Sequence, residues 1–224
     1  MTIVTTPELD EGFAAALAAI PIFPLPGMIL FPGTGIPLHI FEPRYRALLA
    51  HCLATHQALV LAPILAGPED AHGHPPIPKI VGGGVIVQSE TEADGKGNIL
   101  VVGKGRLLLE ERPFEGSFRR GKAILLEDEE SSDEERGRRE LYTAVSGFVS
   151  DLKRKNPDFQ VEFPADAPLG LYTDLVASAL VAEPRVQQQL LETISVDERI
   201  ERLVDVLGVQ RLALRDAPAG NKAN

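Results

Sequence analysis

Residues 20–46 read IPIFPLPGMILFPGTGIPLHIFEPRYR and place five prolines between residues 21 and 37. Proline fixes φ near −65° and lacks an amide donor, so this segment cannot be a helix, and it is expected to be edge-like rather than a central strand. The residues between the prolines are too apolar for a solvated linker. We therefore predict short, kinked β strands that pack into a core, with Gly27, Gly33 and Gly35 supplying the special backbone angles between them.

The end of this stretch predicts a strand followed by a helix. Leu38 and Ile40 alternate with His39, which is typical of a strand, and Glu42-Pro43 is typical of a helix start. We expect the helix to run to about residue 55. Its apolar face predicts a core position for Tyr45, Leu48, Leu49, Cys52 and Leu53.

The order of these motifs resembles the N-terminal domain of Lon proteases. The motifs are PLP at 24–26, LFPG at 30–33 and PLHIFEPRY at 37–45, and the resemblance continues through residues 81–111 and 188–208. It is nearest to short bacterial proteins that look like this domain standing alone. The resemblance implies a part in recognising protein substrates and in assembly of the protease.

The chain up to residue 126 is otherwise rich in strand patterns. A short helix is expected at 7–18 and strands at 58–65, 80–90, 99–111 and 118–126, with a Pro- and Gly-rich loop at 67–78. The Asp94-Gly95 turn signal predicts that residues 80–90 and 99–111 pair as an antiparallel hairpin. Gly82-Gly83-Gly84 and the nearby Gly-x-Gly triplets are read as bulges and turns within the sheet.

The composition changes at residue 127. Residues 127–140 hold eight acidic residues and no apolar one, which predicts a solvated hinge that passes into a helix. Four helices follow by their apolar spacing, and Ser195 with Glu198 fits the capping box of the last one. The predicted fold is α+β, with a β-rich N-terminal half of twisted sheets or a pseudo-barrel with one helix, followed by a C-terminal helical bundle. The predicted domains are 1–126, an acidic hinge at 127–137, a helical subdomain at 138–216 and a disordered tail at 217–224.

Charge and composition restrict the partners. The net charge is −10, which opposes the electrostatic term that dominates nucleic-acid binding. There is no apolar run of about 20 residues to span a bilayer and no basic n-region of a signal peptide. Cys52 is the only cysteine, so no intramolecular disulfide forms. We predict a cytoplasmic protein that binds neither nucleic acid nor membrane and needs no cofactor or metal.

No catalytic motif is present. The chain has no P-loop and no Gly-x-Ser-x-Gly elbow, and the protease and ATPase parts of the Lon family have no counterpart in this length. Cys52 is followed by His56 and preceded by His51, but its position on the apolar helix face indicates a buried, inert thiol. The sequence therefore predicts a chain that is not an enzyme.

Two alternatives remain open. His72 and His74 are spaced so that both imidazoles could reach one metal ion, with Glu69 and Asp70 nearby, which would suit a small metal-dependent hydrolase. The other is a small-ligand sensor with a pocket between the two halves.

The leading hypothesis is a non-catalytic module that binds unfolded or exposed protein segments, or a dedicated protein partner; the oligomeric state is not predicted. The candidate peptide-binding residues stand in or beside the proline-rich stretch: Met28, Phe31, His39, Glu42, Arg44 and Tyr45. The alternative interpretation is structural, with Glu42 capping the helix, Arg44 pairing with an acidic side chain and Tyr45 packing in the core.

Overall fold

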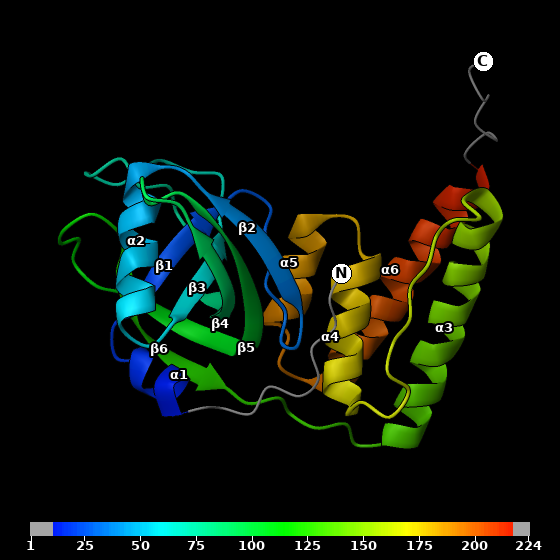
Figure 1. Cartoon of the computed structure of the whole chain (residues 1–224). Helices are drawn as coiled ribbons and strands as arrows, with labels where there is room; N and C mark the ends of the chain where they lie inside the picture. Colours follow the sequence, from blue (N-terminus) through cyan, green and yellow to red (C-terminus); the bar gives the residue numbers. More distant parts are fainter. Residues whose placement is uncertain (1–10, 217–224) are drawn as a thin grey trace, which may run out of the picture.

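The computed structural model describes residues 11–216 and arranges them as a curved sheet beside a group of helices (Figure 1). The strands in chain order are β1 (Ile20–Leu25), β2 (Gly35–Ile40), β3 (Ala58–Pro63), β4 (Ile80–Thr91), β5 (Gly97–Glu111) and β6 (Arg120–Leu126). The helices are α1 (Glu11–Ala16), α2 (Pro43–Ala54), α3 (Glu134–Lys155), α4 (Leu169–Leu180), α5 (Pro184–Glu192) and α6 (Val196–Asp216). The predicted α+β class is confirmed.

The six strands form one sheet that closes on itself over five of them. The strand order is β2-β5-β4-β3-β1-β6, and β6 also pairs with β5. Because β6 pairs with both β1 and β5, the five strands β5-β4-β3-β1-β6 close into a barrel. The strand β2 pairs only with β5 and remains at an edge. The predicted hairpin is β4 with β5, which pair antiparallel along most of their length with irregularities at Gly83/Gly84 and Ile86/Gln88.

The expectation that the first proline-rich strand is edge-like is wrong for β1. This strand pairs in parallel with β3 and antiparallel with β6. The β3 ladder begins only at Ile22, after Pro21, and the β6 ladder ends at Pro21. The amide of Ile22 points towards β6 and donates to Arg119 O at 2.9 Å. Residues two apart in a strand point the same way, so the nitrogen of Pro24, which carries no hydrogen, also points to the β6 side. The pairing with β6 has already ended there. Both prolines therefore avoid a ladder position that needs an amide hydrogen.

The loop between β1 and β2 joins two hydrophobic cores. Leu30 is buried with the side chains between the sheet and α2, whereas Phe31 is buried among the helices α3 to α6. Gly27 and Gly33 have positive φ values of 65° and 72°, as the predicted kinks require, while Gly35 instead begins β2. The proline-rich segment thus fixes the sheet against the helical half.

The helical half consists of four helices, as predicted, and α3 lies beside α6 (Figure 1). A β-carbon on Gly137 would lie 3.1 Å from Ile200, and one on Gly147 would lie 2.5 Å from Arg211, so the two helices run parallel. In the N-terminal half, Phe13 of α1 is fully buried. The predicted helix at 7–18 is described only from residue 11, and the predicted tail at 217–224 lies outside the described residues.

The acidic segment is mostly exposed, and several of its residues are hydrogen-bonded to the start of α6. Glu129 is held against α6, because its amide donates to Ile194 O and its carbonyl accepts from Val196 N, both at 3.0 Å. Ser132 donates its amide and its hydroxyl to Asp197, at 3.0 and 2.6 Å. The helix α3 already begins at Glu134. The division into subdomains at 126 and 138 remains a proposal.

Candidate functional site

The first turn of α2 carries three of the six candidate residues. Arg44 Nε lies 3.0 Å from a carboxylate oxygen of Glu42, and its guanidinium stands 4.5 Å from the centre of the Tyr45 ring. Tyr45 donates its hydroxyl to Pro24 O at 3.2 Å and packs against Phe23 with ring centres 4.2 Å apart. Burial raises the pKa of Tyr45. Glu42 occupies the N-cap position without a side-chain cap hydrogen bond, so that part of the structural interpretation is wrong.

Arg44 and Tyr45 border a small cavity, which we call the Tyr45 pocket. Its volume is about 50 Å³, enough for a small apolar group, and it lies between α2, the end of β1 and two loops. Arg119 in its wall is already engaged, with Glu111 Oε2 at 2.8 Å from its Nε and Pro75 O at 2.8 Å from its Nη1. The lining residues are Ile22, Pro24, Arg44, Tyr45, Ile64, His74, Pro75, Ser117, Phe118 and Arg119. The pocket is therefore apolar with a cationic rim.

His39 lies on β2 and belongs to a different part of the surface. Its Nδ1 is 2.8 Å from Asn98 Oδ1 on β5, and its ring is stacked on Phe41 with centres 6.0 Å apart. Phe41 is 57% exposed. Sequence reasoning did not include Phe41 among the candidates, although a large apolar residue that ends an edge strand is itself a signal of a contact surface.

The outer edge of β2 has no strand partner among residues 11–216. Gly33 N donates to Gly103 O, and Gly103 N donates to Thr34 O, each at 2.9 Å. This bulge determines which residues of β2 point their backbone N–H and C=O groups towards β5. Those of Ile36 and Leu38 point towards β5, whereas those of Pro37 and His39 point outward. The nitrogen of Pro37, which has no hydrogen, therefore points away from β5, so the pairing of β2 with β5 loses no hydrogen bond.

Phe31 and Met28 do not complete a groove with these residues. Phe31 has no exposed surface and packs in the helical core, so its assignment to a peptide groove is wrong. Met28 is half-buried in the loop that follows β1. The structure therefore brings Glu42, Arg44 and Tyr45 together, places His39 at the neighbouring strand edge, and separates Phe31 from both.

The histidine loop is arranged around Asp70. Asp70 accepts hydrogen bonds from the amides of His74 and His72, which lower the pKa of this carboxyl to about 2, and its Oδ2 is 3.2 Å from His74 Nδ1. The two imidazoles flank Phe114, with ring centres 5.2 and 4.5 Å away. Within residues 11–216, no group of three or more His, Cys, Asp or Glu side chains is arranged to hold a metal ion.

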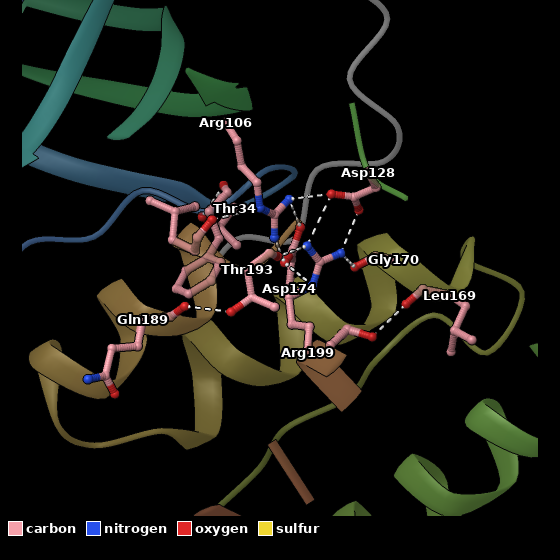
Figure 2. Close-up of polar contacts among 12 residues, drawn as sticks. Thr34, Arg106, Asp128, Leu169, Gly170, Asp174, Gln189, Thr193 and Arg199 are labelled. Atoms are coloured by element: carbon pink, nitrogen blue, oxygen red, sulfur yellow. Dashed lines mark hydrogen bonds and ion pairs between the residues drawn. The ribbon is translucent and has the colours of Figure 1, made fainter. Parts of the chain in front are cut away.

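The junction of the two halves is filled by a buried ionic cluster (Figure 2). Arg106 reaches from β5 to two helices, where its Nη1 donates to Asp174 Oδ2 of α4 and its Nε to Leu191 O of α5, each at 2.9 Å. Arg199 of α6 lies 3.4 Å from Asp174 and 3.1 Å from Asp128 of the acidic segment. Burial opposes the charge of Arg199, but Asp174 and then Asp128 raise its pKa. A cavity of about 260 Å³ lies beside this cluster, between the acidic segment and α4.

Sequence reasoning missed this cluster, although a signal was present. Arg199 stands three residues after Val196 and four before Leu203, so it falls on the apolar stripe of α6. Asp174 likewise stands between buried residues of α4. A charged residue on an apolar helix face predicts a buried partner, but the sequence does not say which one.

The chain matches proteins of one family over most of its length. A family profile described as the ATP-dependent protease La (LON) substrate-binding domain matches residues 19–208. Lon protease 1 of Syntrophobacter fumaroxidans is 27% identical over 88% of this chain, and Lon protease of Parabacteroides distasonis is 27% identical over 92% of it. The aligned part is 24% and 26% of those proteins, so the chain spans about a quarter of their length.

Two solved structures share the fold. The N-terminal domain of a Mycobacterium avium complex Lon protease superimposes with a TM-score of 0.64 and 19% identity, covering 85% of this chain and 98% of that one. A Lon N-terminal domain protein from Xanthomonas campestris gives a TM-score of 0.59 and 19% identity, covering 84% and 97%. Among the described helices, none is long and apolar enough to cross a membrane.

Proposed function

This chain belongs to the family of Lon substrate-binding domains, and from this premise we propose that it binds exposed segments of protein chains without catalysing a reaction. The curated relatives are about four times as long as the part that matches, so the activity of those complete proteins is not assigned to this chain. A cytoplasmic location and the absence of nucleic-acid partners, both inferred from composition, belong to the same proposal.

The observation that supports this function best is the outer edge of β2, which pairs with no strand among residues 11–216. Pro37 and His39 are exposed, so the accessible stretch offers the Pro37 carbonyl and both backbone groups of His39. An extended peptide that pairs with such an edge gains main-chain hydrogen bonds that do not depend on its sequence. Pro37 removes one donor, which limits the strength of the pairing and protects the edge from aggregation.

Two apolar features at the junction of β2 and α2 favour apolar segments. Phe41 presents most of its ring to solvent at the end of β2, and the Tyr45 pocket opens beside the first turn of α2. A bound segment could therefore place one apolar side chain against Phe41 and another in the pocket. Because hydrophobic contacts supply most of this energy, we expect affinities of roughly micromolar strength and little dependence on salt.

Replacing His39 separates backbone pairing from side-chain contact. His39→Pro removes the outward amide hydrogen, whereas His39→Ala removes the imidazole and its contact with Asn98 but keeps the amide. Binding of fluorescent, apolar-rich peptides from an unfolded protein should weaken at least about fivefold in His39→Pro relative to His39→Ala. Circular dichroism would verify that both variants remain folded.

Three outcomes would count against the proposal in different ways. Equal binding by the two variants would exclude pairing at β2. Unchanged binding after Phe41→Ser would exclude the apolar contact. If the folded wild type binds no unfolded peptide even at high micromolar concentration, the role in binding exposed segments is wrong, and a dedicated folded partner or a small ligand becomes the better explanation.

A further inference from the structure

Three arginines surround one buried carboxylate at the C-terminal ends of α3 and α6. Asp151 on α3 is only 4% exposed. Arg211 and Arg215 of α6 each place Nε near its Oδ2, at 2.6 and 3.2 Å, and Arg154 pairs with its Oδ1. Within residues 11–216, Asp151 is the only hydrogen-bonding or ion-pair partner of these three guanidiniums. Most of their N–H groups therefore remain available for a ligand.

The helix backbones are adapted to this arrangement. Because α3 and α6 run parallel, their C-terminal ends lie together (Figure 1). Gly147 in the interior of α3 leaves the space that the Arg211 guanidinium occupies, since a β-carbon there would lie 2.5 Å from its Nη1. Glycine weakens a helix interior, and the approach of Arg211 gives a physical reason for it at this position.

The cluster holds more positive charge than its own carboxylate neutralises. Three arginines stand against the single carboxylate of Asp151, which leaves two positive charges. Two helix C-termini carry roughly half a negative charge each, so they offset about one of the two. The surplus stands out in a chain whose net charge is −10.

A cavity of about 350 Å³ opens at this cluster, lined by Asp151, Arg154, Lys155, Leu214 and Arg215. We propose that it is a docking site for an acidic segment of a partner protein. Guanidinium groups pair in a planar, two-point manner with carboxylates, and Asp151 holds three of them in place before a ligand arrives. Leu214 offers an apolar wall for the methylene groups of a glutamate side chain. The overall negative charge disfavours a long polyanion such as nucleic acid.

This site does not rest on the proposed binding at β2, and it differs from it in salt dependence. Exposed charge pairs are screened within about 10 Å at 0.1 M salt, so docking here should weaken steeply as salt is added. Binding of apolar segments at β2 should change little under the same conditions.

The test uses the whole chain and two matched double variants. Arg154→Gln with Arg215→Gln removes two cluster cations, which are 69% and 54% exposed, so the fold should survive. Arg139→Gln with Arg202→Gln removes two exposed cations from the same helices outside the cluster. The probes are a fluorescent peptide containing a run of glutamates and the same peptide with glutamines, measured at about 20 and about 300 mM NaCl.

We expect the glutamate peptide to bind the wild type at least about tenfold more tightly at low salt than at high salt, and more tightly than the glutamine peptide. The cluster variant should lose at least about tenfold in affinity, and the control variant less than about twofold. Equal losses in the two variants, or equal binding of the two peptides, would overturn the proposal. Tighter binding of single-stranded nucleic acid at the same salt would also overturn it, because the site would then select polyanions in general.

Discussion

The carbonyl oxygen of Leu30 occupies the space where a side chain on Gly82 would stand, because a β-carbon built on Gly82 would lie only 1.9 Å from this oxygen. The same close approach occurs at Gly103, whose β-carbon would lie 2.1 Å from Phe31 O. The proline-rich loop therefore lies directly on the glycines of β4 and β5. Because Gly82 and Gly103 have no side chains, the loop can lie close to both strands and place Leu30 and Phe31 in the two hydrophobic cores.

Gly82→Ala should be strongly destabilising. The added methyl group meets backbone atoms of the loop, which cannot move aside as a flexible side chain can, so we expect a loss of about 3 kcal/mol in the free energy of unfolding. Gly208→Ala is the control, since a β-carbon there meets nothing within 4 Å in α6 and should stabilise the chain by up to about 1 kcal/mol. Urea unfolding measures both, and a Gly82→Ala variant as stable as the wild type would contradict the close contact.

Cys52 should not react with thiol reagents in the folded protein. The thiol has no exposed surface and donates to Ala58 O at 3.4 Å, and burial raises its pKa to about 12. The unfolded thiol ionises near its ordinary pKa of 9. Stability should therefore fall as the pH rises from about 9 towards 12, in the wild type more than in Cys52→Ala. Rapid labelling of the native protein at neutral pH would show that the thiol is accessible.

Local patterns in the sequence predicted most elements because each pattern is set by near neighbours. The Asp94-Gly95 turn predicted the β4–β5 hairpin, and the apolar face of residues 43–54 predicted both α2 and the burial of Cys52. The position of β1 inside the barrel was not predictable from its prolines. Whether a missing donor matters depends on where the neighbouring ladders begin and end, and those strands lie far along the chain.

The candidate site was predicted only in part for the same reason. Arg44 and Tyr45 are adjacent in sequence and remain together in space. Phe31 lies in the same apolar run as Leu30, yet the two side chains enter different cores, and periodicity in an irregular loop does not reveal this. The pair of Arg106 and Asp174 joins residues 68 positions apart, so no local pattern connects them.

Asp197 should control the exposure of the acidic segment to proteolysis. It accepts hydrogen bonds from Ser131 and Ser132, which lower its pKa to about 2. Asp197→Ala should speed cleavage within residues 127–135 by a Glu-specific protease, because it releases both serines. Asp205→Ala, an exposed substitution on the same helix, should leave the cleavage rate unchanged.

The pH dependence of this contact follows from the lowered pKa of Asp197. A carboxylate with a depressed pKa stabilises the fold above its ordinary value near 4, and this contribution disappears as the pH falls towards 2. The difference in stability between the wild type and Asp197→Ala should therefore be largest above about pH 4 and vanish near pH 2. A stability difference that stays constant between about pH 4 and about pH 2 would show that the hydrogen bonds from Ser131 and Ser132 do not require the charged form of Asp197.

Breaking the ion pair between Arg106 and Asp174 should have the largest effect of any charge substitution outside the proposed binding surfaces. Both side chains are almost fully buried, so Arg106→Met or Asp174→Leu leaves a charged group without its partner and should cost about 3 to 5 kcal/mol. The double variant, Arg106→Met with Asp174→Leu, should lose clearly less stability than the two single variants together. It lacks both charges of the pair, so neither charge is left buried without the other. The exposed pair of Arg44 and Glu42 provides the comparison, and Arg44→Met should cost no more than about 1 kcal/mol. Urea unfolding of the four variants forms the test. Additive losses would mean that Arg106 and Asp174 are not coupled.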